Sequence, residues 1–500
     1  MLFNSLEFLL FFPIVVLGYY IIPKKARYIW LLIGSYYFYM CWNAVYALLI
    51  LSSTIFTYLG GLVIGKTAVK EGNIAGRKKH KLILVIVLLV NLGILGYFKY
   101  SNFLLEIVES VAGLFGSTLT IRKADILLPV GISFYTFQAL SYSIDVYRGD
   151  IRPEKNFFKY ALFVSFFPQL VAGPIERSKN LLSQIQQSET IRFDSHRVWN
   201  GLVTMVWGLF LKMVIADRLA ILVDNIFDKY YFFGGVELII GAVAFALQIY
   251  CDFASYSTMA IGAAKVLGFT LMENFDAPYF ALSVKEFWRS WHISLSTWFR
   301  DYLYIPLGGN RRGKARKHLN LLVTFLISGL WHGAGLTFII WGGLHGLYQV
   351  IGDALLPERK KIVKKLHINT DCFSHKFLKM FITFVLVDFA WIFFRADNVL
   401  VAFDYIRRIF TGMNPWVLTN GGLLKMGLSG LEFNILMVAL VILFAVDLLK
   451  YRRKKNIADF ILEQNVWFQY LCIIGLIMTI FVFGVYGATY DAKAFIYFQF

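Results

Sequence analysis

Long apolar segments separated by short polar ones recur along the whole chain. Because a helix needs about 20 apolar residues to cross the hydrocarbon core of a bilayer, these segments predict membrane-spanning helices. The predicted spans are residues 6–22, 28–42, 45–65, 81–98, 126–147, 157–172, 197–217, 237–252, 253–268, 318–334, 336–352, 376–396, 430–449 and 466–486. Several middle segments are short or carry polar residues, so we expect about 11 to 14 membrane segments, some of them re-entrant.

The apolar runs are continuous and do not alternate with polar residues as they do in the strands of a β-barrel. They therefore predict an all-α polytopic bundle. The longest polar stretches, such as 173–196 and 354–376, are too short to fold alone. We therefore expect one membrane-embedded domain over residues 1–500. No basic residue precedes the first apolar segment and no small-residue cleavage site follows it, which predicts a retained helix.

Composition supports this class, because the chain is 58% hydrophobic and only 16% charged. The net charge of +18 resides mainly in short loops, the usual result of the positive-inside rule, so nucleic acid is not an expected partner. The basic segments at 24–27, 66–81, 311–317, 359–365 and 450–455 are expected on the cytoplasmic side, with both termini outside. The four cysteines are scattered and predict neither a disulfide framework nor a metal site.

His332 lies inside the apolar stretch 319–341, within the run Gly-Leu-Trp-His-Gly-Ala. An ionisable side chain in hydrocarbon costs about 2.5 kcal/mol or more, so it is a functional candidate. Imidazole also titrates near neutral pH, which suits a general base. The alternative is a buried histidine that is merely hydrogen-bonded. His332 follows the cytoplasmic loop by about fourteen residues, which at about 1.5 Å per residue places it most of the way across the bilayer.

Residues 287–309 combine tryptophan with charge and predict one amphipathic helix. Its apolar stripe contains Trp288, Trp291, Leu295, Trp298 and Tyr302, and its polar stripe contains Arg289, His292, Ser296 and Arg300. Pro306 and the pair Gly308-Gly309 are expected to end it. The helix is either interfacial, with its arginines at lipid phosphate, or folded into the bundle, with His292 and the arginines lining a polar channel.

Other polar side chains also stand in apolar context. They include Gln138, Tyr142 and Asp145 in one segment, Lys212 in another, Gln248, Asp252 and Ser255 in a third, and His345 in Trp-Gly-Gly-Leu-His-Gly. Such groups usually pair across helices, but together they would also suit a wet tunnel. Residue types alone leave both interpretations open.

Three ordered motifs resemble the membrane-bound O-acyltransferase (MBOAT) superfamily. They are the Trp291-His292 segment, the run from Phe299 to Asn310, and the run from Ser328 to Gly333. Within the superfamily the chain is most similar to the alginate O-acetyltransferase (AlgI-like) branch, which also fits residues 171–175, the opening 2–5 and the closing 490–500.

This resemblance implies a compact helical bundle around a central channel, with His332 as the catalytic histidine and His292 as a second, more variable one. Trp331, Arg289, Arg300, Asp301, Gln138, Tyr142, Asp252 and His345 are expected along the substrate channel, with Arg300 and Asp301 paired at its mouth. No metal and no permanently bound cofactor is expected. The implied donor is cytoplasmic acetyl-CoA, and the implied partners are membrane lipids, a polysaccharide and a secreted, hydrolase-like extracytoplasmic transferase.

We therefore expect a multi-pass enzyme of the cell membrane that O-acetylates an exopolysaccharide or cell-wall polymer, as in alginate biosynthesis, with His332 as general base. Transfer of another acyl group, such as D-alanine onto teichoic acid, is the alternative within the same fold. A transporter with a buried proton relay is the alternative from another class, although no transporter-type repeat is visible.

Overall fold

The computed structural model describes residues 1–67, 74–116, 120–123, 128–486 and 496. Over these residues the chain is helical and contains no β-strand, which confirms the all-α prediction. Its contacts divide it into two compact units, Met1–Met205 with Ser257–Met272 (unit 1) and Val206–Tyr256 with Glu273–Phe500 (unit 2). The prediction of one domain over residues 1–500 stays a prediction.

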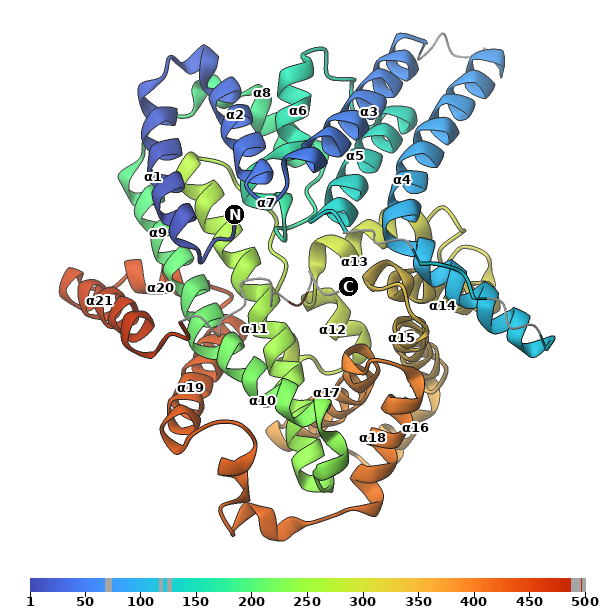
Figure 1. Ribbon diagram of the computed structural model, residues 1–500, viewed down its shortest axis with the longest axis vertical. Coiled ribbons are helices and arrows are strands. Elements are labelled where there is room, and N and C mark those ends of the chain that lie inside the picture. The colour runs from blue at the N-terminus through green and yellow to red at the C-terminus, as the bar shows by residue number, and fades with distance from the viewer. Residues whose placement is uncertain (68–73, 117–119, 124–127, 487–495, 497–500) are drawn as a thin grey trace. The chain divides into compact units, whose positions relative to one another are not determined.

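Unit 1 holds the first eight α-helices and the start of the ninth. They are α1 (Leu6–Ile21), α2 (Arg27–Met40), α3 (Ala47–Thr67), α4 (Ile74–Leu114), α5 (Ile132–Arg148), α6 (Phe157–Ser165), α7 (Phe167–Leu170), α8 (Ser183–Gln186) and α9 (Ser195–Phe210). Helix α5 packs against α3 and α4, and α6 packs against α2 (Figure 1). Almost every residue of α5 is buried, so this helix is the core of the unit.

Unit 2 contains the remaining helices, and α11 runs from it into unit 1. They are α10 (Asp217–Asp228), α11 (Gly235–Leu267), α12 (Val284–Ser290), α13 (Ile293–Phe299), α14 (Gly313–His332), α15 (Leu336–Ala354), α16 (Leu356–Lys365), α17 (Phe373–Arg395), α18 (Val399–Thr411), α19 (Gly430–Arg453), α20 (Ile457–Leu462) and α21 (Val466–Phe483). The antiparallel pair α14 and α15 makes the most extensive helix contact, and α15 packs in turn on α17 (Figure 1).

Three predicted spans are wrong in detail. Segments 237–252 and 253–268 form the single helix α11, because the polar residues at their junction are bonded within the protein: Ser255 donates to the Asp252 carbonyl at 2.6 Å. Segment 157–172 is instead broken into α6 and α7. Pro168 stands at the start of α7, and a proline there has no amide hydrogen to continue the preceding helix.

Six helices within the described residues are long and apolar enough to cross a bilayer. These are Ala44–Lys66, Lys78–Leu114, Gly235–Leu267, Phe373–Arg395, Gly430–Arg453 and Val466–Phe483, and Leu6–Ile21 is a shorter apolar helix. The protein is therefore a multi-pass membrane protein. The remaining predicted segments correspond to shorter or more polar helices, and the first two residues of segment 126–147 lie outside the described residues.

Candidate active site

His332 is the last residue of α14 and is almost completely buried. Its Nδ1 lies 2.7 Å from the carbonyl oxygen of Ser328, one turn earlier in the same helix. A carbonyl only accepts hydrogen bonds, so Nδ1 must carry a proton. In the neutral ring the lone pair therefore resides on Nε2, which is the arrangement that a general base requires.

Aromatic rings surround His332. Its ring centroid lies 4.9 Å from Trp331, 4.8 Å from Trp341 and 5.8 Å from Phe394, all in edge-on geometry. Three elements contribute these rings, because Trp331 lies on α14, Trp341 on α15 and Phe394 on α17. Large side chains packed in this way leave the imidazole few alternative orientations.

His292 lies in a tight break between α12 and α13, with φ 43° and ψ 55°. This left-handed conformation is costly for a residue with a Cβ, and such strain persists only where neighbours enforce it. Asn274 provides the restraint: its carbonyl accepts from the Ile293 amide at 3.0 Å, and its Oδ1 accepts from the Ser294 hydroxyl at 2.6 Å. The break turns His292 into the interior, where it is fully buried.

The structure brings the two candidate histidines together. The rings of His292 and His332 lie 6.4 Å apart, centroid to centroid, and His292 also lies 6.1 Å from Trp331. Phe253 of α11 packs edge-on against His292 at 4.6 Å. The two imidazoles are therefore close neighbours in the interior of unit 2.

The prediction of one continuous helix over residues 287–305 is wrong. The left-handed backbone at His292 ends α12, and a π-helical turn, η8 (Arg300–Tyr304), follows α13. The polar stripe is consequently divided: His292 is buried, whereas Arg289 and Arg300 are exposed. The expected ion pair is present, with Arg300 Nε 2.7 Å from Asp301 Oδ1.

His345 of α15 is fully buried and differs from His332 in its hydrogen bonding. The indole of Trp288 donates to His345 Nδ1 at 3.2 Å. Because this Nδ1 accepts, the proton of the neutral ring resides on Nε2, the opposite tautomer to that of His332. Among the described residues His345 Nε2 has no hydrogen-bond partner, and the His345 ring packs against Trp341 at 5.1 Å.

The other predicted channel residues have structural partners. Asp252 lies in unit 2 and pairs with Lys212 at 2.6 Å. In unit 1, Gln138 donates to the Phe163 carbonyl at 2.5 Å and accepts from Gln169 at 2.9 Å. These contacts are of the kind expected if the polar side chains pair with groups on other segments, which was the first of the two interpretations.

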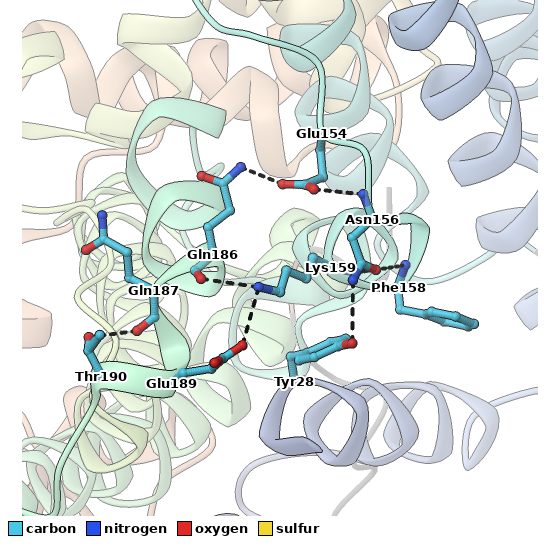
Figure 2. A network of polar contacts seen from close by, with 9 residues as sticks. All are labelled: Tyr28, Glu154, Asn156, Phe158, Lys159, Gln186, Gln187, Glu189 and Thr190. Carbon is cyan, nitrogen blue, oxygen red and sulfur yellow. Dashed lines mark hydrogen bonds and ion pairs between the residues drawn. The ribbon is translucent and has the colours of Figure 1, made fainter. Parts of the chain in front are cut away.

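Tyr142, also in unit 1, leads to the polar network of Figure 2. Its hydroxyl accepts from the amide of Glu154 at 3.0 Å. The Glu154 carboxylate in turn accepts from the Asn156 amide at 2.8 Å and from the Gln186 side chain at 2.5 Å (Figure 2). Lys159 joins Gln186 to Glu189 in the same network (Figure 2). The network joins the segment before α6 to the segment around α8.

Sequence reasoning missed three residues that hold the site. Asn274 braces the His292 break, Phe253 packs on His292, and Trp341 packs on His332. None of the three carried a signal, because Asn274 lies in the polar stretch Met-Glu-Asn-Phe-Asp and the two aromatic residues lie in apolar segments. Within the described part of the chain, no group of three His, Cys, Asp or Glu side chains is arranged to hold a metal ion.

The fold and the site define a helical multi-pass membrane protein with two neighbouring buried histidines. Comparison with known proteins specifies the family: residues 151–394 match the model of the MBOAT, membrane-bound O-acyltransferase family. The chain belongs to this family and is an O-acyltransferase.

Three relatives illustrate the range of similarity. The chain is 41% identical over 445 residues to the "Probable alginate O-acetylase AlgI" of Pseudomonas aeruginosa, covering 89% of this chain and 81% of the relative. It is 35% identical over 444 residues to the peptidoglycan O-acetyltransferase of Helicobacter pylori, covering 83% and 80%. The teichoic acid D-alanyltransferase of Streptococcus thermophilus is more distant, at 29% identity over 246 residues, 47% of this chain and 59% of the relative.

Proposed function

We propose that this O-acyltransferase moves an acetyl group from cytoplasmic acetyl-CoA to an extracytoplasmic acceptor, for O-acetylation of an exopolysaccharide or cell-wall polymer. The observation that carries the proposal is the hydrogen bond from His332 Nδ1 to the Ser328 carbonyl, which leaves Nε2 as the proton acceptor of a buried imidazole. The long matches to an alginate O-acetylase and a peptidoglycan O-acetyltransferase support the acetyl group and the polymeric acceptor.

The chemistry needs one base and no redox partner. An acceptor hydroxyl attacks the thioester carbonyl while His332 Nε2 takes its proton, and a C–O bond forms. The tetrahedral intermediate then breaks its C–S bond, and the thiolate leaves with the proton returned by His332. A positioned general base typically contributes 10²–10⁴-fold to such a step, and a site that excludes water limits hydrolysis of the thioester.

His292 is proposed as the second catalytic histidine, because its ring lies 6.4 Å from that of His332. At that distance it is placed to contact the thioester carbonyl or the acceptor bound at Nε2 of His332. Trp331 and His345 are proposed as site-lining residues on the same grounds of proximity to these rings. Arg289, Arg300 and Asp301 remain predicted channel residues, as do Gln138, Tyr142 and Asp252.

The proposed orientation places the basic loops at 66–81 and 311–317 on the cytoplasmic side of the cell membrane. Merging two predicted spans into α11 removes one crossing between these loops. The nine residues of α6 reach about 14 Å at 1.5 Å per residue, too short for a core of about 30 Å. Treating α6–α7 as re-entrant removes a second crossing, so the two loops remain on the same side.

An acceptor outside the membrane implies a partner that completes the modification. We propose that the acetyl group passes to a separate, secreted, hydrolase-like transferase, or directly to the polysaccharide. Both acceptors offer a hydroxyl group, so the chemistry at His332 is the same in each case.

Substitution of His332 tests the proposal. His332→Asn keeps a side-chain amide where Nδ1 donates to Ser328 but has no atom at the position of Nε2. Membranes containing this variant, supplied with radiolabelled acetyl-CoA, should transfer at least about 100-fold less label to polymer. His196→Ala, at an exposed histidine in the first turn of α9, should leave transfer unchanged. Full transfer by folded His332→Asn protein would refute the role of His332 as general base.

Transfer of D-alanine from a carrier-protein thioester is the second candidate. The match to a teichoic acid D-alanyltransferase favours it, although it covers only 47% of this chain. Mass spectrometry of the modified polymer separates the two, because an acetyl ester adds about 42 Da per site and a D-alanyl ester about 71 Da. An increase of about 71 Da would show that the donor is a D-alanyl carrier-protein thioester rather than acetyl-CoA. The proposed role of His332 as general base would stay the same.

A further inference from the structure

Three buried charges form a cluster in unit 2, separate from the histidines. Lys212 Nζ lies 2.8 Å from Asp217 Oδ1 and 2.6 Å from Asp252 Oδ1. All three side chains are at least 95% buried. Removing charges from water is costly even when they are paired, and apolar residues of similar volume are often equally stable. A cluster of this kind therefore calls for a role beyond stability.

A π-helical turn, η5 (Leu211–Ala216), brings two of these charges together. The amide of Asp217 bonds to the carbonyl of Lys212, five residues earlier. On a regular α-helix, residues five apart point about 140° away from each other. The wider π turn reduces that angle, so the ammonium and the carboxylate share one face. Such turns are frequent at functional sites.

The same region holds Ile496 and the residues at the end of α21. Asp252 Oδ2 accepts from the amide of Ile496 at 2.8 Å, while its Oδ1 pairs with Lys212. The amide of Val485 bonds to the Met213 carbonyl of the π turn at 2.9 Å. Arg218 donates to the Phe483 carbonyl at 2.7 Å. Two segments that follow α21 are thus fixed at the cluster.

Helix α11 connects the cluster to the histidine site. Asp252 and Phe253 are consecutive residues of this helix. The Phe253 ring packs edge-on against His292 at 4.6 Å and against Phe275 at 5.1 Å. A helical turn moves as a unit, so a restraint on the Asp252 carboxylate also fixes where the Phe253 ring meets His292.

We propose that Lys212, Asp217 and Asp252 are positioning residues for acyl transfer. They hold one turn of α11 and the backbone at Ile496 so that Phe253 keeps His292 in its strained, inward conformation. Their effect on the reaction passes through Phe253, whose ring packs on His292. This inference rests on the proposed function of the histidine pair.

The test removes the charges without leaving one unpaired. The triple variant Lys212→Met/Asp217→Leu/Asp252→Leu has no uncompensated buried charge and is expected to fold. Its kcat for transfer of radiolabelled acetyl from acetyl-CoA to membrane polymer should fall at least tenfold, with KM for acetyl-CoA within twofold of the unsubstituted protein. Arg407→Gln/Asp404→Asn, which removes an exposed ion pair of α18, should leave kcat unchanged.

A double-mutant cycle with Phe253→Leu distinguishes an effect of the cluster through Phe253 from a general loss of structural rigidity. If the cluster acts through Phe253, the triple variant should lose little further kcat when Phe253→Leu is added. Independent, multiplicative losses would overturn the proposal, as would an unchanged kcat in the triple variant. Should the triple variant fail to fold, Lys212→Gln/Asp217→Asn/Asp252→Asn also removes all three charges, keeps polar side chains of similar shape, and is held to the same two criteria.

The outcome for His332→Asn distinguishes the two levels of inference. Loss of transfer in His332→Asn together with full transfer in the cluster variants would refute only the positioning role. Full transfer in folded His332→Asn would refute the proposed function on which that role depends.

Discussion

Individual hydrogen bonds decide what each buried imidazole can do. His332 donates from Nδ1 to a carbonyl, whereas His345 accepts at Nδ1 from the Trp288 indole. Two histidines in similarly apolar sequence therefore present opposite tautomers. The sequence identified both as candidates, but the partner that fixes each proton is a residue brought close by folding. For His345 that partner is 57 positions away along the chain.

A charged residue at the end of α15 gives a pH-dependent prediction. Lys317 and His318 lie 2.6 Å and 3.0 Å from the Asp353 carboxylate and lower the pKa of Asp353 from 3.8 to about 2. A lowered pKa means that the contribution to stability is complete above about pH 4 and is lost as the pH falls toward 2.

Asp353→Asn should therefore lower the thermal midpoint of the detergent-solubilised protein at pH 6. The cost should be small, about 0.2–1 kcal/mol, because the pair is partly exposed. Thermal unfolding from pH 6 to pH 3 should show the difference from the unsubstituted protein shrinking as the solution becomes more acidic. A difference that grows on acidification would contradict the assigned sign.

Close packing of α14 on α15 depends on glycines at the level of whole helices. A Cβ on Gly342 would lie 2.3 Å from the Phe325 carbonyl oxygen and 3.1 Å from the Gly329 Cα, both backbone atoms of α14. Neither atom can move without moving its helix. The apolar pattern predicted the two consecutive spans 318–334 and 336–352, yet it did not show which glycines face each other, because that depends on the relative rotation and register of the helices.

Gly342→Ala should separate α14 from α15 and destabilise the protein by about 1–3 kcal/mol, typical of overpacking. Because His332 ends α14, acyl transfer should fall as well. The matched control is Gly352→Ala in the same helix, where a Cβ meets no heavy atom within 4 Å. Helix propensity predicts that this control is neutral or stabilising by up to about 1 kcal/mol. Equal thermal midpoints for Gly342→Ala and Gly352→Ala would show that α14 and α15 do not approach closely at Gly342.

At the scale of the whole molecule, the order of the membrane crossings follows from helix continuity. The apolar pattern predicted the position of most helices, from α1 and α2 to α19 and α21, and six of the described helices are long and apolar enough to cross a membrane. It failed at residues 157–172 and 237–268, where hydropathy alone detects neither a break nor continuity. The polar residues in the middle of α11 are hydrogen-bonded within the protein, so this helix continues through them. Pro168 prevents α6 from continuing into α7.

The proposed topology predicts cytoplasmic exposure of the loop before α14. Lys314→Cys, made in a chain whose four native cysteines are replaced by serine, should react with a membrane-impermeant maleimide only after spheroplasts are permeabilised. Thr419→Cys, in the segment between α18 and α19, is expected on the opposite side and should react in intact spheroplasts. Labelling of Lys314→Cys in intact spheroplasts would invert the orientation and the proposed direction of transfer.

The sequence by itself determined the all-α membrane class, the family resemblance and the two histidines, because long apolar runs and short motifs are local properties. Only the tertiary structure decided that His292 turns inward beside His332, that Asn274 and Phe253 hold it there, and that Lys212 lies between two carboxylates. Those relations join segments far apart in the chain. They depend on backbone breaks and helix register, which composition and periodicity do not encode.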